Sequence, residues 1–401
     1  MMNLALDEDT TFAQFACLVN CLATYLRHDR FQNACIRHHL LEPLLSVLRH
    51  SYAISVDESS SEDVQLLSQL QLKLNQALSD ISALPQFAET YPLDSPLINS
   101  LKSWLEAPDE QLQICACVML GNLARSDEMC QVMIESLNIH KSLIAILRRD
   151  VRGSILHASL GFLKNLAIAG ENRRKLGDAQ VIPVVSHIWT LDSVPQVQLA
   201  AVSLIRLVVT GSFENISRLL DPLSPDPDSP AHLRTYLSLL LSLFGKTDAA
   251  PIQTEIGRLI ASLCRTLVPR AREEDHDAEV LLDRLFRLHE DVSRPIGAMV
   301  TQTEWPVVRS EGWFTLALMA SNSQGSSAVA DCIQRMDVYQ LLEDSLSADV
   351  SHPDSEGGGL QRSKDRDNII ILLKEVLSHN VRFFRSDFCP CVERKVKLTC
   401  T

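Results

Sequence analysis

A pattern of about 42 residues recurs along this chain of 401 residues and constrains the fold more than any other feature. Gln113–Ala124 (QICACVMLGNLA) and Leu156–Ala167 (LHASLGFLKNLA) share Leu, Asn, Leu and Ala at positions 43 residues apart. A third copy, Val197–Val208 (VQLAAVSLIRLV), follows 41 residues later and carries Arg206 in the position of the asparagine. Each copy has the apolar spacing of a long helix.

Two shorter helices are predicted between consecutive copies. Glu128–Arg149 reads as a short helix, then Asn138, then a second helix, and Asn172–Trp189 repeats this order. Glycine supplies only 14 of 401 residues, which is low for a protein with many tight turns. A repeat of three helices in about 42 residues fits armadillo or HEAT units rather than the shorter tetratricopeptide or ankyrin units. The sequence therefore predicts an all-α, right-handed superhelical solenoid of the armadillo/HEAT type.

Breaks in the pattern divide the chain. Asp221–Pro230 carries four prolines and cannot be helical, and Val268–Glu279 reads as a charged insertion. The predicted parts are a degenerate N-terminal repeat at 10–55, a second degenerate repeat at 64–106, the core of the array at 110–350, a disordered loop at 351–367, and a truncated final repeat with a tail at 368–401.

Charge and hydropathy exclude several classes of protein. The net charge of −13 argues against general binding to nucleic acid or to an anionic membrane, and favours a basic partner. The N-terminus lacks the features of a signal peptide, and no apolar stretch is long enough to span a membrane. The 11 cysteines are scattered, and Cys115 and Cys117 fall in an apolar helical run, so we expect reduced thiols, mostly in the core of a cytosolic protein.

Motifs for covalent chemistry are missing from the sequence. It contains no dinucleotide-binding or phosphate-binding glycine loop, no nucleophile elbow and no HExxH. Cys389 and Cys391 are separated by one residue, unlike the usual redox spacing. Glu273–Asp275 with Asp277 could bind a cation, but a solvated loop is favoured. We therefore expect no enzyme activity, no catalytic residue, no metal site and no cofactor.

Asn122 and Asn165 follow the main apolar run of their helices, and Arg206 takes the same place in the next copy. One interpretation is structural, with each amide satisfying backbone groups of the neighbouring repeat. The other is a ladder that holds the backbone of a partner. A tryptophan four residues before such an asparagine, as in importin-type peptide grooves, is absent here. The spacing leaves both interpretations open.

Several blocks resemble the SmgGDS proteins, which are armadillo-repeat GDP dissociation stimulators of small GTPases. Met119–Cys130 (MLGNLARSDEMC) and His157–Leu176 (HASLGFLKNLAIAGENRRKL) resemble family segments of the form ALANFARND-x-x-C and HAALSALRNLAIP. Gly257–Arg265 and Gly297–Ala320 continue the likeness in the same order. The resemblance covers about 110–320 well and 10–105 weakly.

The resemblance implies a function in binding. Family members bind Rho- and Rap-type GTPases with a polybasic, prenylated C-terminus, act as their chaperones, and promote release of GDP. It also implies that residues on the concave face bind the GTPase. The family has a second Asn in its ARND segment, and this chain has Ser126 at that position. The candidates on the concave face are Asn122, Asn165, Lys164, Arg206, Arg258 and Glu311. The family's lipid slot would fall within Phe12–Leu105.

We therefore expect a cytoplasmic monomer that binds a small GTPase on a negatively charged inner wall, without binding nucleic acid or entering a membrane. The resemblance implies that the protein could also occur at the surface of the endoplasmic reticulum, in the mitochondrion or in the nucleus. The alternative is a general armadillo adaptor that binds peptides or helical segments without affecting nucleotide exchange.

Overall fold

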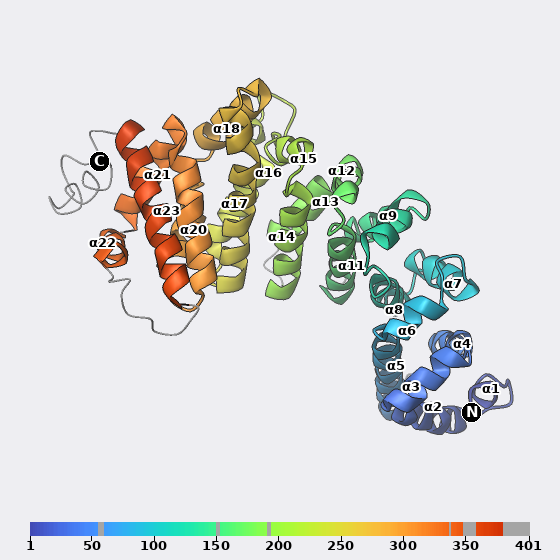
Figure 1. The fold of residues 1–401 in the computed structure, drawn as a ribbon. Helices are drawn as coiled ribbons and strands as arrows, with labels where there is room; N and C mark the ends of the chain where they lie inside the picture. The colour runs from blue at the N-terminus through green and yellow to red at the C-terminus, as the bar shows by residue number, and fades with distance from the viewer. Residues whose placement is uncertain (55–59, 150–152, 191–193, 337, 348–357, 380–401) are drawn as a thin grey trace. The chain divides into compact units, whose positions relative to one another are not determined.

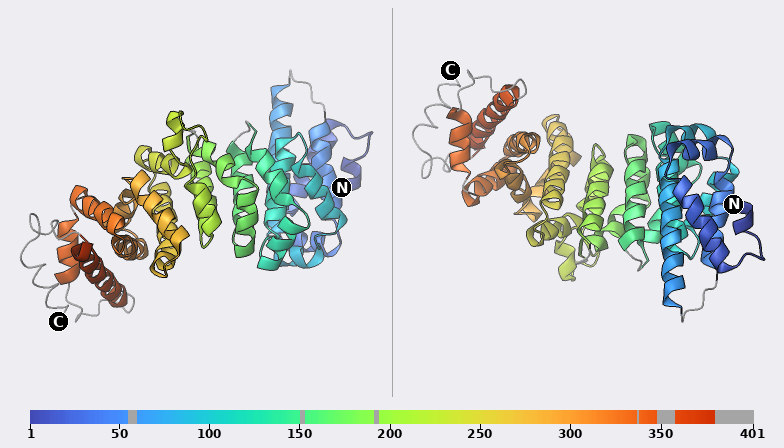
Figure 2. Two further views of the ribbon diagram at one scale, coloured as in Figure 1. Left: turned by 90° about the horizontal axis from the view of Figure 1, so that it is seen from above. Right: turned by 90° about the horizontal axis from the view of Figure 1, so that it is seen from below.

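The computed structural model describes residues 1–54, 60–149, 153–190, 194–336, 338–347 and 358–379. Over these residues every regular element is a helix, and the β-type pairing is limited to one isolated bridge between Pro222 and Thr235. The chain divides into two compact units, Met1–Ala169 and Gly170–Thr401. The all-α prediction is confirmed (Figures 1 and 2).

Unit 1 contains eleven helices within its described residues. They are α1 (Met2–Ala5), α2 (Phe12–Tyr25), α3 (Asp29–Arg37), α4 (Leu41–Ala53), α5 (Ser61–Ser82), α6 (Pro85–Thr90), α7 (Pro96–Leu105), α8 (Glu110–Gly121), α9 (Asp127–Glu135), α10 (Ile139–Leu147) and α11 (Gly153–Leu166).

Unit 2 continues the series with two shorter helices before each long third helix, although α18 and α21 are longer than the second helices that follow them. Its elements are α12 (Gly170–Asp178), α13 (Val181–Ser186), the 3-10 helix η1 (His187–Thr190), α14 (Pro195–Val209), α15 (Phe213–Leu219), the 3-10 helix η2 (Pro230–Leu233), α16 (Tyr236–Lys246), α17 (Ala250–Arg272), α18 (His276–Leu288), α19 (Arg294–Thr301), α20 (Pro306–Ala320), α21 (Ser323–Arg335), α22 (Tyr339–Ser347) and α23 (Gly358–His379).

The helices form triads, and the spacing of the middle triads confirms the predicted period. Their first helices begin at Pro85, Asp127, Gly170 and Phe213, which are 42, 43 and 43 residues apart, whereas the intervals from Asp29 to Pro85 and from Phe213 to His276 are 56 and 63 residues. The third helices contact one another in sequence: α2, α5, α8 and α11 in unit 1, and α14, α17, α20 and α23 in unit 2 (Figure 1). Stacking of this kind buries the apolar faces that one triad cannot bury alone.

Local sequence explains where the helices begin and turn. Asp109 accepts hydrogen bonds from the backbone N–H groups of the first turn of α8, and a proline occupies the first turn of α14 and of α20. Asn138 and Gln180 precede the second helices of their triads with φ of 53° and 65°. The left-handed conformation at these positions turns the chain from the first helix into the second.

The predicted parts of the chain agree with the structure only in places. The segment 10–55 contains α2, α3 and α4, yet α3 and α4 form a triad with α5, which lies in the predicted segment 64–106. The predicted core at 110–350 begins with α8, which is the third helix of the triad started by α6. The structure therefore places the boundaries of the repeats ahead of α3, α6 and α9.

Two predicted breaks are corrected by the structure. The disordered loop expected at 351–367 is wrong from Gly358 onward, because α23 begins there and the Asp365 carboxylate accepts a hydrogen bond from Ser310 of α20. The insertion expected at Val268–Glu279 is confined to 273–275, because α17 continues through Pro269 to Arg272. Residues 351–357 and the tail at 380–401, which includes Cys389 and Cys391, lie outside the described residues. Asp221–Pro230 is free of α-helix, as expected.

The cores of both units are apolar, and cysteines occur in them as predicted. Cys115 and Cys117 of α8 and Cys264 of α17 are buried, and burial raises the pKa of each of these thiols to about 12. Cys17 and Cys21 of α2 are exposed. None of the helices within the described ranges is both long enough and apolar enough to span a bilayer.

We predict a sharp difference in thiol reactivity. Iodoacetamide at pH 8 should alkylate Cys17 and Cys21 of the native protein within minutes, since the reagent reaches both thiols. Cys115 and Cys264 should react only when their units open, because both are buried and almost none of either thiol is ionised. Peptide mass spectrometry over a time course measures the four rates. Equal rates at Cys17 and Cys264 in the absence of denaturant would contradict this packing.

Candidate functional site

The predicted site residues all lie on third helices or directly follow them. Asn122 follows the last residue of α8, and Lys164 and Asn165 are in the last turn of α11. In unit 2, Arg206 belongs to α14, Arg258 to α17 and Glu311 to α20. All six side chains are half-buried. We call the face of the third helices that carries these six residues, in each unit, the third-helix stripe.

The two asparagines of unit 1 each join their helix to the preceding third helix. The Asn122 Nδ2 donates to Ser82 Oγ at 2.9 Å and to the Ser79 carbonyl at 3.4 Å, both in α5. The Asn165 Nδ2 donates to the Gly121 carbonyl of α8 at 3.1 Å. These bonds support the structural interpretation, because the amides satisfy groups of the neighbouring repeat.

Part of each amide remains available for a partner. The Oδ1 atoms of Asn122 and Asn165 accept no hydrogen bond from the described residues. Lys164 has no hydrogen bond or ion pair within the same ranges of the chain. An incoming backbone could donate to the two amide oxygens while their Nδ2 groups stay bonded to the fold. The two interpretations of the asparagines are therefore compatible.

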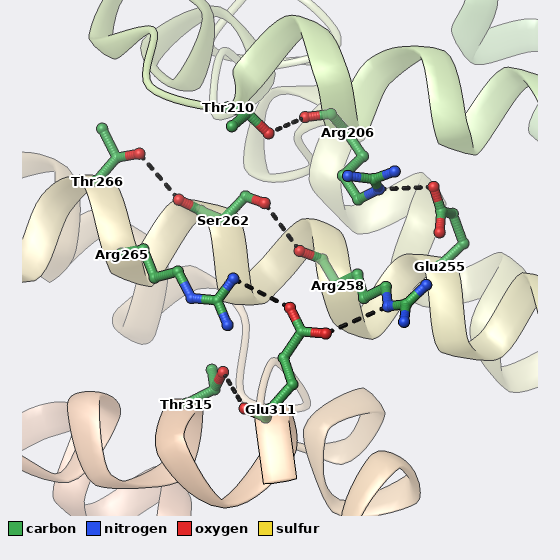
Figure 3. A network of polar contacts seen from close by, with 9 residues as sticks. All are labelled: Arg206, Thr210, Glu255, Arg258, Ser262, Arg265, Thr266, Glu311 and Thr315. Carbon is green, nitrogen blue, oxygen red and sulfur yellow. Dashed lines mark hydrogen bonds and ion pairs between the residues drawn. The ribbon is translucent and has the colours of Figure 1, made fainter. Parts of the chain in front are cut away.

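The predicted residues of unit 2 form ion pairs across consecutive third helices (Figure 3). The Arg206 Nε lies 2.6 Å from Glu255 Oε1, which joins α14 to α17. The Arg258 Nε lies 3.2 Å from Glu311 Oε2, and the Arg265 NH1 lies 3.0 Å from Glu311 Oε1, so two guanidinium groups of α17 hold one carboxylate of α20. The structure brings Arg258 and Glu311 together and connects Arg206 to the same row through Glu255.

Two members of this row were missing from the sequence prediction. Glu255 comes three residues before Arg258, and Arg265 comes seven residues after it, so both share a face of α17 with it. Arg265 also lies over the Phe314 ring, with 5.5 Å between its guanidinium carbon and the ring centroid. Helical spacing around Arg258 is the signal that could have identified both residues.

The expected negatively charged inner wall is not found on the stripe of unit 2. Its three arginine side chains are 28, 36 and 43% exposed, whereas Glu255 and Glu311 are 10 and 18% exposed. The more accessible charge is therefore positive. More exposed carboxylates of unit 2 lie elsewhere, in turns as at Asp226 and Glu273 and on helices as at Asp178 of α12 and Glu279 of α18. The negative net charge of the whole chain therefore does not predict the sign of the charge that this stripe exposes.

A metal site is not indicated by the side chains. Within the described ranges, no group of three or more His, Cys, Asp or Glu side chains is arranged to hold a metal ion. Asp275, in the acidic run that could have bound a cation, accepts a hydrogen bond from the Ala278 N–H at the start of α18 and pairs with Arg270 at 2.8 Å. These two contacts hold the pKa of its carboxyl below the usual value.

Comparison with known sequences confirms the resemblance. The chain is 26% identical over 248 residues to Rap1 GTPase-GDP dissociation stimulator 1-B of Xenopus laevis, which covers 61% of this chain and 38% of that protein. It is 24% identical over 206 residues to the GTPase-GDP dissociation stimulator vimar of Drosophila melanogaster, covering 49% of this chain and 30% of that protein. The chain thus spans about a third of the length of the curated relatives it matches. No family model matches it.

Comparison with solved structures confirms the armadillo fold. An engineered protein superimposes with a TM-score of 0.55 at 16% identity, over 98% of this chain and 92% of its own. A designed armadillo repeat protein gives a TM-score of 0.51 at 17% identity, over 69% of this chain and 98% of its own. A chain from a study of the cadherin and β-catenin interaction gives 0.57 at 16% identity, over 93% of this chain and 67% of its own. At these identities the likeness concerns the fold alone.

Proposed function

We propose that this chain, whose curated homologues are GDP dissociation stimulators of the SmgGDS type, binds a small GTPase of the Rho or Rap type and promotes release of its GDP. The observation that carries the proposal is the match to the Xenopus protein over 248 residues. We further propose that the chain acts as a chaperone for the GTPase when its polybasic C-terminus is prenylated, as a cytoplasmic monomer.

The proposed mechanism needs binding energy and no covalent step. A partner that binds the nucleotide-free shape of a GTPase more tightly than the GDP-bound shape lowers the affinity for GDP by the same factor. The third-helix stripe would supply this contact through the amide oxygens of Asn122 and Asn165 and the ammonium of Lys164. The fold holds these asparagines in place before the partner arrives, which reduces the entropy lost on binding.

Long-range attraction would bring the two proteins together. The chain has a net charge of −13, which attracts a polybasic tail from a distance without defining its final position. The arginines of α17 suit acidic groups on the body of the GTPase instead. We therefore expect the association rate to fall with added salt, because salt screens the attraction between separated charges.

The test is the release of a fluorescent GDP analogue from purified Rap1 and RhoA at low and at moderate salt. We expect this chain to accelerate release from at least one of them, with a smaller effect at moderate salt. A complex seen by gel filtration without acceleration would support the adaptor alternative. Neither a complex nor acceleration, with either GTPase, would refute the proposal.

Asn122 and Ser126 offer a matched pair of variants. We predict that Asn122→Ala weakens GTPase binding by about 1–3 kcal/mol, because it removes an acceptor at a desolvated contact. We predict that Ser126→Asn, which introduces the family's residue, keeps or tightens binding, since Asn replaces Ser well at the N-cap of α9. Titration calorimetry measures both affinities. An unchanged affinity for Asn122→Ala with a lowered melting temperature would assign the residue to packing alone.

A further inference from the structure

Unit 1 and unit 2 each contain a groove of the same construction, where the end of one second helix, the start of a third helix and the next second helix meet. In unit 1 these elements are α7, α8 and α10, and in unit 2 they are η1, α14 and α16. Gln113 and Gln198 are each the fourth residue of their third helix, and both line their groove. The two grooves are therefore equivalent positions in the repeat.

The second helices line the two grooves with the same spacing. In unit 1 Ser142, Ala145, Ile146 and Arg149 line the groove, with Lys141 as a further lining residue, and in unit 2 the corresponding four are Leu239, Ser242, Leu243 and Lys246. Each set begins at the fourth residue of its helix and ends on a cation seven positions later. Residues at this spacing share one face of a helix, so the equivalence can be followed residue by residue.

The groove of unit 1 is largely satisfied by its own side chains. The Ser142 hydroxyl donates to Glu106 Oε1 at 3.2 Å, and the Arg149 NH2 donates to Gln113 Oε1 at 2.9 Å. Glu106 also places a negative charge in the groove against the positive charges of Arg149 and Lys141. The groove of unit 1 therefore has one carboxylate against two cations, and its arginine is held by a hydrogen bond within the fold.

The groove of unit 2 lacks this internal balance. No carboxylate is among its described lining residues: Thr190, which lies eight residues before Gln198, is neutral, whereas Glu106 of unit 1 lies seven residues before Gln113. Lys246 takes the place of Arg149, and Arg234 adds a second cation to the lining. Neither cation has a hydrogen bond or ion pair across the ranges that the structure describes. Two positive charges therefore line a groove whose own residues leave them unneutralised.

The remaining lining suits a ligand that is partly apolar. Leu239 is half-buried and supplies apolar surface, and Ser242 and Thr247 supply hydroxyl groups. Trp189 and Leu243 also line the groove but are 3 and 5% exposed, and among the described residues the Trp189 indole N–H has no acceptor. The groove has a volume of about 420 Å³, which lies in the range of small-molecule sites.

We propose that the groove between η1, α14 and α16 binds a small organic anion. Its phosphate or carboxylate group contacts Arg234 and Lys246, and its apolar body lies against Leu239. The site is separate from the proposed GTPase contact, because none of the six residues assigned to that contact lines it.

The experiment measures binding to the full chain by titration calorimetry. Phenyl phosphate and benzoate are the two anionic probes, and benzyl alcohol is the neutral probe. We expect saturable binding of at least one anion and none of the alcohol; the stronger anion identifies the head group. Lys246→Gln and Arg234→Gln should each weaken binding by about tenfold, since each removes one charge-assisted contact.

Two further variants use the groove of unit 1 as the control. Thr190→Glu adds a carboxylate to the lining of the unit 2 groove and should abolish binding, whereas Lys141→Gln in unit 1 should leave it unchanged. Thr190 and Lys141 are exposed, so both variants should fold, which circular dichroism checks. The proposal is overturned if neither anion binds, if the alcohol binds equally well, or if Lys246→Gln and Thr190→Glu have no effect.

Discussion

Replacing Trp313 with alanine is expected to lower the free energy of unfolding of unit 2 by about 4 kcal/mol, as is usual for a buried tryptophan. Trp313 lies in α20 and is 0% exposed, so alanine would leave a large cavity. Its helix contacts α17, α19, α21 and α23, and the loss would therefore weaken packing within and between triads. Urea unfolding followed by circular dichroism measures the change.

Trp305 provides the matched control for this variant. It is the N-cap residue of the same helix and is 64% exposed, so Trp305→Ala should change the stability by less than about 0.5 kcal/mol. Trp313→Phe should cost much less than Trp313→Ala, because it keeps most of the ring and removes an indole N–H that has no acceptor in the described parts of the chain. Equal free energies of unfolding for Trp313→Ala and Trp305→Ala would contradict the burial of Trp313 in the core around α20.

Removing one member of the pair between α14 and α17 should also be costly. Arg206→Met is expected to destabilise unit 2 by about 2 kcal/mol, because it leaves the Glu255 carboxylate almost buried and without its partner. Glu255→Leu should cost less, since Arg206 is 28% exposed and can be hydrated. Urea unfolding of both variants gives the two values.

The double variant separates the ion pair from the packing of the two side chains. If the two charges stabilise each other, the double variant Arg206→Met with Glu255→Leu should lose less free energy of unfolding than the two single variants added together, by about 1–2 kcal/mol. Replacing both charges by apolar groups removes the buried charge along with its partner. Additive effects of the two substitutions would show that the 2.6 Å contact contributes nothing specific.

Repetition made much of the fold predictable. The grouping of two shorter helices before one long helix and the spacing of about 42 residues in the middle triads follow from apolar periodicity, and Asn138 already marked the turn between two helices. Burial of Cys115 and Cys117 followed from their place in an apolar run. The asparagines were placed correctly on third helices for the same reason, because a repeated sequence adopts a repeated local structure.

The site was predictable as a set of positions and unpredictable as a set of contacts. Arg206 and Arg258 fell on the expected helices, but their partners Glu255 and Glu311 lie 49 and 53 residues away along the chain. The acceptors of Asn122 lie 40 and 43 residues away. Contacts between residues so far apart in the sequence depend on how adjacent triads pack. The helical periodicity within one triad does not encode that packing.

By itself the sequence determined the all-α repeat, the helix that carries each candidate residue and the likeness to GTPase-GDP dissociation stimulators. These properties depend on local spacing and on residue identity, which a linear sequence contains in full. Tertiary structure alone decided that the stripe of unit 2 exposes more positive than negative charge, that α23 begins at Gly358, and that Arg234 and Lys246 share a groove. Each depends on which side chains packing covers and which it brings together, because net charge and glycine content are sums over the chain that carry no information about position in space.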